Sequence, residues 1–480
     1  MNFQLQLCTD YNRFANRVIL ISEDTDLKKL GFDKKTTQAL ENYYREKINH
    51  IYSCTTPEGN VHVVKLDIAH SAIKNTENAR HAGYQVNRLL NGKKIKEASL
   101  YSYVDKSFTA AMLEGLVLSN YEFLKYKTLQ KNEKSLAKLH IDRRCADKEM
   151  IAGITAIATG VFFTRDLVNE PQSFLTATQL SREISSAGKK FGFQVTVFDK
   201  RKITQLGMGG LLAVNQGSVE PPTFTILEYK PARAVNKKPI VLVGKGIVYD
   251  TGGLSLKPTP NSMDFMKCDM AGAALVAGTF ISVALNKIPV HLIGLVPATD
   301  NRPGGHAYAP GDVIKMMSGL NVEMLNSDAE GRMILADALH YAKQYKPELV
   351  MDFATLTGAA KVAFSHVLTP YMGTADEAVK KQIEASGDAV YERLLELPLY
   401  EEYGEMIKSD LADIKNIGGP EAGAITAAKF LEHFTDYPWL HFDIAGTAYI
   451  TRDDSYRGKY ATGIGVRLLT HYLKNYPSTR

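Results

Sequence analysis

Acidic residues stand at three points of the chain where an apolar run meets a polar turn. Asp250 precedes Thr-Gly-Gly, and Asp269 opens a run of small apolar residues. Asp328 and Glu330 open a third run, "NSDAEGRMILADAL". Carboxylates brought together repel, and one stays protonated unless a cation neutralises the group. Two metal ions bridged by shared carboxylates form a known catalytic arrangement, so the acids predict a metal site if the fold gathers these turns.

The segment 327–330 also has a plain structural interpretation. Ser327-Asp-Ala-Glu330 fits the S-x-x-E capping box, in which the serine and the glutamate satisfy open N–H groups at the start of a helix. Acidic side chains in a first turn also complement the helix dipole. These four residues alone favour the cap, and only the other acids favour metal binding.

Lysines accompany the acids in "VLVGKGIVYDTGGLSLKP", residues 241–258. Lys245 lies between two glycines and Lys257 precedes a proline. A phosphate-binding loop is one interpretation, but the Walker pattern fails because glycine follows Lys245 where the pattern needs Ser or Thr. No HExxH or H-x₃₋₅-H pairing occurs, so a histidine zinc site is not expected. Oxygen ligands suit Mg²⁺ or Mn²⁺, with Zn²⁺ as an alternative.

The elements that must position these residues alternate between strand and helix patterns. Helical spacing is found at 147–168, at 266–287 and after Asp328. Such alternation predicts an α/β domain with a mostly parallel mixed sheet flanked by helices, and ligands bind at the carboxyl ends of strands in such sheets. The β-branched runs are 194–198, 223–229, 239–244, 290–296, 349–353 and 439–446.

Length and charge predict two domains. A chain of 480 residues is too long for one typical core. Residues 1–145 carry a net charge of +7 and the remainder −2. We expect a smaller N-terminal α/β domain over 1–145, for assembly or regulation. A larger catalytic domain follows over 146–480, beginning with a connecting helix near 147–168.

Composition limits the class of protein. The four cysteines are scattered, which argues against a disulfide framework or a zinc knuckle. The N-terminus lacks a signal-peptide pattern. The sequence contains no run of 18 or more apolar residues, so no membrane span is predicted. A cytoplasmic protein without a membrane partner is expected. The basic stretch 125–145 permits a nucleic-acid patch, but it carries no recognition motif, and a solvated surface is the favoured interpretation.

Five motifs in order are similar to the leucine aminopeptidase (cytosol aminopeptidase) family of two-metal exopeptidases. The likeness extends through "TRDLVNEPQSFLTATQL" and "ADIKNIGGPEAGAITAAKFLEHF" and reaches the N-terminal part through "EGLVLSNYEFLKYKT". The five motifs are "GKGIVYDTGGLSLKP", "MKCDMAGAA", "NSDAEGR", "MDFATLTGAA" and "WLHFDIAGTA".

The resemblance implies a role for each residue of the metal site. Asp250 and Glu330 would bridge two divalent ions, Zn²⁺ or Mn²⁺, with Mg²⁺ or Co²⁺ as alternatives. Lys245 and Asp269 would complete one metal site, and Asp328 would serve the more exchangeable one. A lysine ligand must be the neutral amine, which an adjacent dication favours.

The resemblance also implies two catalytic residues and a substrate pocket. Lys257 would stabilise the oxyanion of the tetrahedral intermediate, and Arg332 would hold a bicarbonate ion acting as general base. Peptides with a free N-terminus would be the substrates, because one metal would hold the α-amine, and leucine or another apolar residue would be released. A homohexamer is implied. The substrate-binding residues would be Met266, Thr355, Leu356, Gly358, Ala445 and Ala448.

The chain departs from the family pattern in a few places. Ser327, Thr251 and Ala271 are small changes from the usual threonine, serine and glycine. The stretch between Lys257 and Asp269 is one residue longer than expected, which could alter the choice of substrate.

Other classes of function fit parts of the same pattern. A metallophosphatase could use these carboxylates with Lys257, but it needs phosphate-binding arginines and only Arg332 is near. A DNA-binding or regulatory relative with weak or no peptidase activity is the alternative that the basic N-terminal part permits. A serine hydrolase is disfavoured because no G-x-S-x-G occurs.

Overall fold

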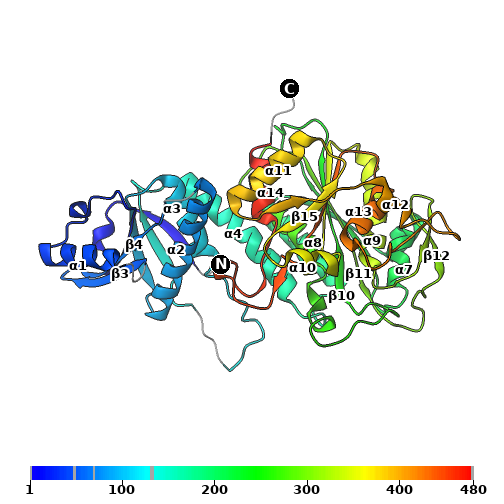
Figure 1. The fold of residues 1–480 in the computed structure, drawn as a ribbon, viewed down its shortest axis with the longest axis horizontal. Coiled ribbons are helices and arrows are strands. Elements are labelled where there is room, and N and C mark those ends of the chain that lie inside the picture. Colours follow the sequence, from blue (N-terminus) through cyan, green and yellow to red (C-terminus); the bar gives the residue numbers. More distant parts are fainter. Residues whose placement is uncertain (1–2, 47–49, 69–70, 130–133, 477–480) are drawn as a thin grey trace. The chain divides into compact units, whose positions relative to one another are not determined.

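The computed structural model describes residues 3–46, 50–68, 71–129 and 134–476 (Figure 1). The chain forms two compact units, and the first comprises Met1–Thr159 together with Asp453–Gly458. The second comprises Gly160–Arg452 and Lys459–Arg480. The division falls within helix α4 (Lys148–Asn169), whereas the sequence placed the domain boundary just before this helix.

The first unit is built on a six-stranded sheet in the order β1-β6-β5-β2-β4-β3. All neighbours pair in parallel except β3 and β4, which form an antiparallel pair. Helices α2 and α3 contact each other through the ion pair of Arg80 with Glu114, at 2.7 Å. The elements are β1 (Gln4–Cys8), β2 (Asn16–Ile21), α1 (Lys34–Arg45), β3 (Ile51–Thr56), β4 (Gly59–Lys65), α2 (Ala72–Gly92), β5 (Glu97–Ser102), α3 (Lys106–Leu118) and β6 (Lys138–Asp142).

A buried carboxylate holds the late segment Asp453–Gly458 within this first unit. Glu77 on α2 is fully buried and accepts hydrogen bonds from the Tyr456 hydroxyl, with both oxygens at 3.0 Å. Arg80 pairs with the same carboxylate at 3.2 Å and Arg457 at 3.3 Å. A buried charge is stable only when it is paired and hydrogen-bonded, and these contacts meet that need.

The second unit contains a nine-stranded mixed sheet. Its order is β16-β15-β18-β14-β9-β11-β8-β7, and β10 pairs with β11 off this path. The central strands β18, β14, β9 and β11 are parallel neighbours, while β15 joins β18, β8 joins β11 and β7 joins β8 as antiparallel pairs. The strands are β7 (Gln194–Phe198), β8 (Thr223–Tyr229), β9 (Ile240–Gly244), β10 (Gly246–Asp250), β11 (Leu292–Asn301), β14 (Leu349–Ala354), β15 (Thr369–Gly373), β16 (Leu394–Glu396) and β18 (Trp439–Asp443).

Helices cover both faces of this sheet. Along β9, Ile240 and Leu242 join one buried cluster while Val241 and Val243 join another, as alternation along a strand requires. The first cluster includes residues of α5, α8, α11 and α14, and the second includes residues of α7, α9 and α13. The helices are α5 (Ala177–Phe191), α6 (Lys200–Gln205), α7 (Gly209–Asn215), α8 (Ala271–Leu285), α9 (Glu330–Ala342), α10 (Gly358–Phe364), α11 (Glu377–Val390), α12 (Glu401–Glu405), α13 (Gly423–Glu432) and α14 (Val466–Lys474).

The observed architecture confirms the predicted fold class, a mostly parallel mixed sheet flanked by helices. Each β-branched run of the sequence forms a strand of the large sheet, and buried central strands read as continuous apolar runs because helices cover both of their faces. Two smaller sheets complete the unit: β12 (Asp312–Lys315), β13 (Asn321–Met324) and β17 (Ile414–Lys415); and β19 (Tyr449–Ile450) with β20 (Tyr460–Ala461).

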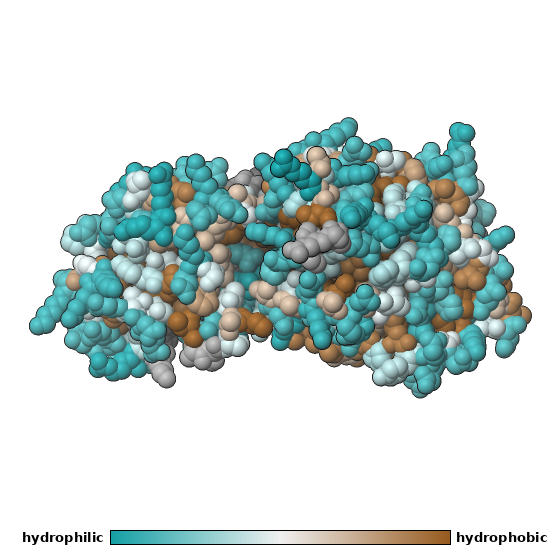
Figure 2. Space-filling view, turned by 90° about the horizontal axis from the view of Figure 1, so that it is seen from above, coloured by the Kyte–Doolittle hydropathy of each residue, from teal (hydrophilic) through white to brown (hydrophobic). Residues whose placement is uncertain are grey.

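Two described segments are long and apolar enough to cross a membrane by length and composition. They are Lys148–Asn169 and Met263–Leu285, with 50% and 89% of the apolar window buried inside the fold. Burial against the sheet accounts for the composition of the second segment. On the face drawn in Figure 2, hydrophilic residues predominate and hydrophobic ones form small separate patches among them.

Candidate metal centre

Four acidic side chains reach one place at the carboxyl ends of the central strands. Asp250 is the last residue of β10, and Asp269 lies between a 3₁₀ turn (Met263–Cys268) and α8. Asp328 precedes α9, and Glu330 is the first residue of that helix. The structure therefore gathers the three turns that the sequence singled out.

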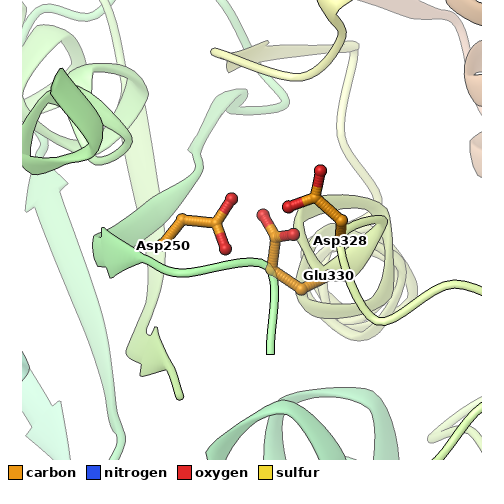
Figure 3. Close-up of side chains that lie close together, drawn as sticks. All are labelled: Asp250, Asp328 and Glu330. Carbon is orange, nitrogen blue, oxygen red and sulfur yellow. The ribbon is translucent and has the colours of Figure 1, made fainter. Parts of the chain in front are cut away.

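The carboxylates of Asp250, Asp328 and Glu330 point toward one another (Figure 3). One oxygen from each lies within 4.8 Å of the others, close enough for a shared metal ion. Asp250 and Glu330 are almost fully buried, whereas Asp328 is about one-third exposed at its side chain. The group can therefore hold a metal ion that is shielded on one side and accessible on the other.

Two lysines pair with these acids. The Nζ of Lys245 lies 2.8 Å from Asp269 Oδ2 and 2.9 Å from Glu330 Oε1, and it donates to the Thr355 carbonyl at 2.9 Å. The Nζ of Lys257 lies 2.8 Å from Asp250 Oδ2 and 2.5 Å from Asp328 Oδ1.

Burial and the neighbouring carboxylates shift the pKa values of Asp269 and Asp328 upward. Burial raises the pKa of Asp269 well above its usual range. Burial, with the charges of Asp250 and Glu330, raises the pKa of Asp328 to about 7. Burial would lower the pKa of the Lys245 ammonium, but Asp269, Glu330 and Asp250 outweigh it and raise that pKa. A site this rich in buried carboxylates favours cations strongly.

Donor chemistry also fits a metal pair. The Oε2 atom of Glu330 is buried and has no hydrogen-bond partner in the described part of the chain. Buried carboxylate oxygens are normally satisfied, so an unpartnered one beside two other carboxylates fits a metal ligand. The residues present therefore fit divalent ions.

The capping-box interpretation of Ser327 is wrong. The first position before α9 is Ala329, which makes no side-chain cap. The Ser327 hydroxyl instead donates to the Gly252 carbonyl at 2.6 Å and accepts from the Ser255 amide at 2.8 Å. It therefore ties the start of α9 to the turn after Asp250, which fixes the two groups of acids relative to each other.

Arg332 lies in the first turn of α9 and is 7% exposed. Its Nη1 donates to the Asn416 carbonyl at 2.7 Å, while its Nε is buried without a hydrogen-bond partner among the described residues. Burial lowers the pKa of its guanidinium to about 10. Arg332 lines the same cavity as the acids, so its free donor fits a small oxyanion such as bicarbonate.

A cavity of about 730 Å³ opens beside the acids. Five of the six predicted substrate-binding residues line it: Met266, Thr355, Leu356, Gly358 and Ala445. Ala448 does not line the cavity; it is 3% exposed and packs in the core cluster that includes α8.

The longer stretch before Asp269 also reaches the cavity. Asn261 and Ser262 line it, and Asn261 adopts a left-handed backbone with a φ of 62°. The predicted effect of this stretch on substrate choice therefore concerns residues at the cavity wall.

Asn301 was missed by the sequence analysis. It is the last residue of β11, and its Nδ2 donates to Asp250 Oδ1 and to the Ser327 carbonyl at 2.8 and 2.9 Å. Thr355 was predicted only for substrate binding, yet its hydroxyl donates to Asp269 Oδ1 at 2.8 Å. A polar residue ending the buried run "LIGLVPATDN" was the available signal for Asn301.

Residues 162–470 match the model of the cytosol aminopeptidase family, catalytic domain. The chain belongs to the cytosol aminopeptidase family. This confirms the predicted leucine aminopeptidase resemblance and the prediction of a metal-dependent, leucyl-type aminopeptidase, a hydrolase of peptide bonds. The cluster of Asp250, Asp328 and Glu330 is a place in which this metal-dependent peptidase can hold an ion.

Curated relatives cover most of the chain. The "Probable cytosol aminopeptidase" of Geobacter sulfurreducens is 43% identical over 86% of this chain and 84% of its own length. That of Chlorobaculum tepidum is 47% identical over 77% and 76%. Among solved structures, the bottromycin maturation enzyme BotP in complex with Mn has a TM-score of 0.85 at 28% identity, covering 96% of this chain and 99% of its own.

Proposed function

We propose that this member of the cytosol aminopeptidase family removes the N-terminal residue of peptides with two divalent ions bound at the carboxyl ends of the central strands. The observation that carries the proposal is the convergence of four carboxylates on Lys245 and Lys257 beside a cavity. Four carboxylates balance the charge of two divalent ions.

The ligands divide according to their positions. Asp250 and Glu330, each with one carboxylate oxygen within 4.8 Å of the other's, would hold both ions. Lys245 and Asp269 would complete the more buried site, and Asp328 the more exposed one. Zn²⁺ or Mn²⁺ is proposed for the pair, and the solved relative BotP was obtained with Mn.

The chain's own groups then assist hydrolysis. When bound, the ions would supply a nucleophilic water at neutral pH and polarise the scissile carbonyl. Lys257, 14% exposed at its side chain, faces the cavity and would donate to the carbonyl oxygen as negative charge develops on it. The free Nε of Arg332 would hold a bicarbonate ion, whose chemistry is to accept the proton of the attacking water.

Leucine and other apolar N-terminal residues are the proposed substrates. Met266, Leu356 and Ala445 give the cavity an apolar part beside the acids. A homohexamer in the cytoplasm is proposed on the family resemblance. Light scattering behind a sizing column would test the assembly.

The deciding experiment is hydrolysis of leucine 4-nitroanilide by the purified protein. Chelator-treated enzyme would be compared with samples given back Zn²⁺, Mn²⁺, Co²⁺ or Mg²⁺, and N-acetyl-leucine 4-nitroanilide would serve as control. We expect metal-dependent cleavage that requires the free amine. Lack of cleavage with every metal, across several N-terminal residues, would overturn the proposal.

A further inference from the structure

One wall of the cavity carries basic side chains that the proposed mechanism does not use. We call Lys361, Ser365, His366 and Arg452 the outer wall; all four line the cavity that holds the acids. Lys361 lies on α10, three positions after Gly358, so both residues share one face of the helix. Ser365 and His366 follow the same helix directly.

Contacts join Ser365, His366 and Arg452 of the outer wall. The Nη2 atom of Arg452 lies 3.1 Å from His366 Nδ1 and 3.0 Å from Nε2, and the Ser365 hydroxyl lies 3.1 Å from Nδ1. The backbone of Gly446 approaches the Ser365 carbonyl so closely that an added Cβ would lie 1.9 Å from its oxygen. The loop that carries Arg452 is therefore packed against the end of α10.

No carboxylate of the described chain neutralises these cations. Lys361 and Arg452 have no acidic partner within 4.0 Å among the residues that the structure describes. Every acidic residue in the described lining belongs to the metal-binding set: Asp250, Asp269, Asp328 and Glu330.

The balance of charge in the cavity favours an anion at the outer wall. Two divalent ions would cancel the four carboxylates, leaving Lys257 and Arg332 for the reaction and Lys361 and Arg452 without a counter-charge. Lys361, Ser365 and Arg452 are exposed at the rim of the cavity, and a bound substrate that displaces water there would strengthen their interaction with an anion. The wall thus offers two cations and a hydroxyl to a carboxylate, which accepts only.

We propose that the outer wall binds a carboxylate of the substrate, so that peptides with an acidic group near the scissile bond are preferred over their neutral analogues. The inference rests on the proposed aminopeptidase function and names a substrate class for that same site. The carboxylate has two possible sources: an acidic side chain at the first or second residue, or the free C-terminus of a dipeptide.

Three matched substrate pairs separate these sources. They are glutamate against glutamine 4-nitroanilide, Leu-Asp-amide against Leu-Asn-amide, and Leu-Gly against Leu-Gly-amide. For each pair the measured quantity is the ratio of kcat/KM for the acid to kcat/KM for the neutral partner. We expect a ratio of about ten or more in at least one pair, because one charge-assisted hydrogen bond accounts for such a factor.

Variants then assign the preference to the wall. Lys361→Met and Arg452→Gln should each lower that ratio about tenfold, through KM more than kcat. Lys361→Glu should reverse the ratio. Exposed residues outside the cavity, Lys381 on α11 and Arg182 on α5, provide the controls Lys381→Met and Arg182→Gln, which should keep the wild-type ratio.

The outcomes separate this inference from the proposed function. Ratios below about two in all three pairs, with leucine 4-nitroanilide still cleaved, would overturn the carboxylate site and leave the aminopeptidase intact. An acid preference that survives in both Lys361→Met and Arg452→Gln would also overturn it. Loss of all cleavage in the wild type would instead refute the proposed function itself.

Discussion

Lys245 and Lys257 have the same side chain, but their surroundings suit different tasks. Lys245 is 3% exposed at its side chain and donates to the Thr355 carbonyl as well as to acids, so it is held in place from all sides. The side chain of Lys257 is 14% exposed, and its Nζ pairs with Asp250 and Asp328. A fixed amine suits a ligand, and a cation at the cavity suits a developing negative charge.

Substitution of Lys257 tests this division. Lys257→Ala should lower kcat about a hundredfold, because one donor to the developing charge is lost. The variant should still bind close to the wild-type amount of metal, since the four carboxylates remain. Metal content by mass spectrometry and kcat on leucine 4-nitroanilide would check both. Loss of the metals along with activity would point to a structural role for Lys257.

Glu330→Gln distinguishes a ligand from a helix-start residue. Glutamine keeps the size and helical preference of glutamate, so the circular dichroism of the protein should not change. Its neutral amide cannot bridge two cations, and activity should fall by about a thousandfold or more, together with metal content. Wild-type turnover in this variant would remove Glu330 from the metal site.

Asp337 predicts a pH dependence of stability away from the metal site. Its carboxylate accepts from the Leu211 and Met317 amides, and burial raises its pKa to about 7. An unfolded aspartate titrates near ~3.9, so the native state retains this proton as pH rises while the unfolded state loses it. The contribution of Asp337 to the stability of the folded state is therefore present below about pH 4 and is lost as pH rises through about 7.

The measurement is the melting temperature at pH 4 to 8, for wild type and Asp337→Asn in chelator. The variant should be less stable at pH 5, since it can accept only one of the two amides, by about 1–3 kcal/mol. The difference from wild type should narrow as pH rises toward 8. A difference in melting temperature between wild type and Asp337→Asn that stays constant over this pH range would contradict the predicted role of Asp337.

At the scale of elements, the first turn of α9 packs tightly against Lys245, which lies at the junction between β9 and β10. A Cβ at Gly331 would lie 2.6 Å from Cε of Lys245, because the glycine lets the lysine pass over the helix start. Ser327 adds the link to the turn after Asp250. These two contacts set how β10 and α9 present their acids.

Gly331→Ala should disturb the site without disturbing the helix. Alanine is favoured over glycine in a helix by about 1 kcal/mol, so folding is not expected to suffer. The added methyl would displace Lys245, and we expect weaker binding of one metal and at least about tenfold lower activity. Metal titration by calorimetry would measure the first effect. Gly305→Ala is the control, since its Cβ would meet no atom within 4 Å; equal affinities in both variants would refute the contact.

At this scale, features with a local cause could be predicted from the sequence, whereas features that depend on distant residues could not. Strand runs such as 349–353 carry their own signal, because buried parallel strands are apolar throughout. The role of Ser327 could not be read from S-x-x-E, because its partner is a turn 75 positions away that only the fold brings near. Ala448 likewise fits a pocket motif, yet its position in the core follows from packing around α8.

At the scale of the molecule, the six residues Asp453–Gly458 leave the second unit and join the first. Tyr456 donates a hydrogen bond to Glu77, 379 positions away in the sequence, and a local sequence pattern cannot predict such a contact. This explains why a linear boundary at 145 was predicted whereas the compact units are discontinuous.

Tyr456→Phe should loosen this segment. The variant loses a hydroxyl that donates to a buried carboxylate, a bond of about 1.5–3 kcal/mol, so local opening should become about tenfold or more frequent. Limited trypsin digestion, followed by mass spectrometry, should show faster cleavage after Arg457 or Lys459. Tyr400→Phe, at a tyrosine that is 65% exposed, is the control. Equal cleavage rates in the two variants would show that Tyr456 does not anchor the segment.

Because the first unit is discontinuous in sequence, it can be completed only late in the synthesis of the chain. Its sheet and helices lie within the first 159 residues to be synthesised, but its last segment, Asp453–Gly458, is made only after the whole of 160–452. At roughly 5–20 residues per second, that interval lasts about 15–60 s. During this time Glu77 has no Tyr456 beside it. We therefore expect the N-terminal part of a nascent chain to remain incomplete until translation is nearly finished, and both units to mature together.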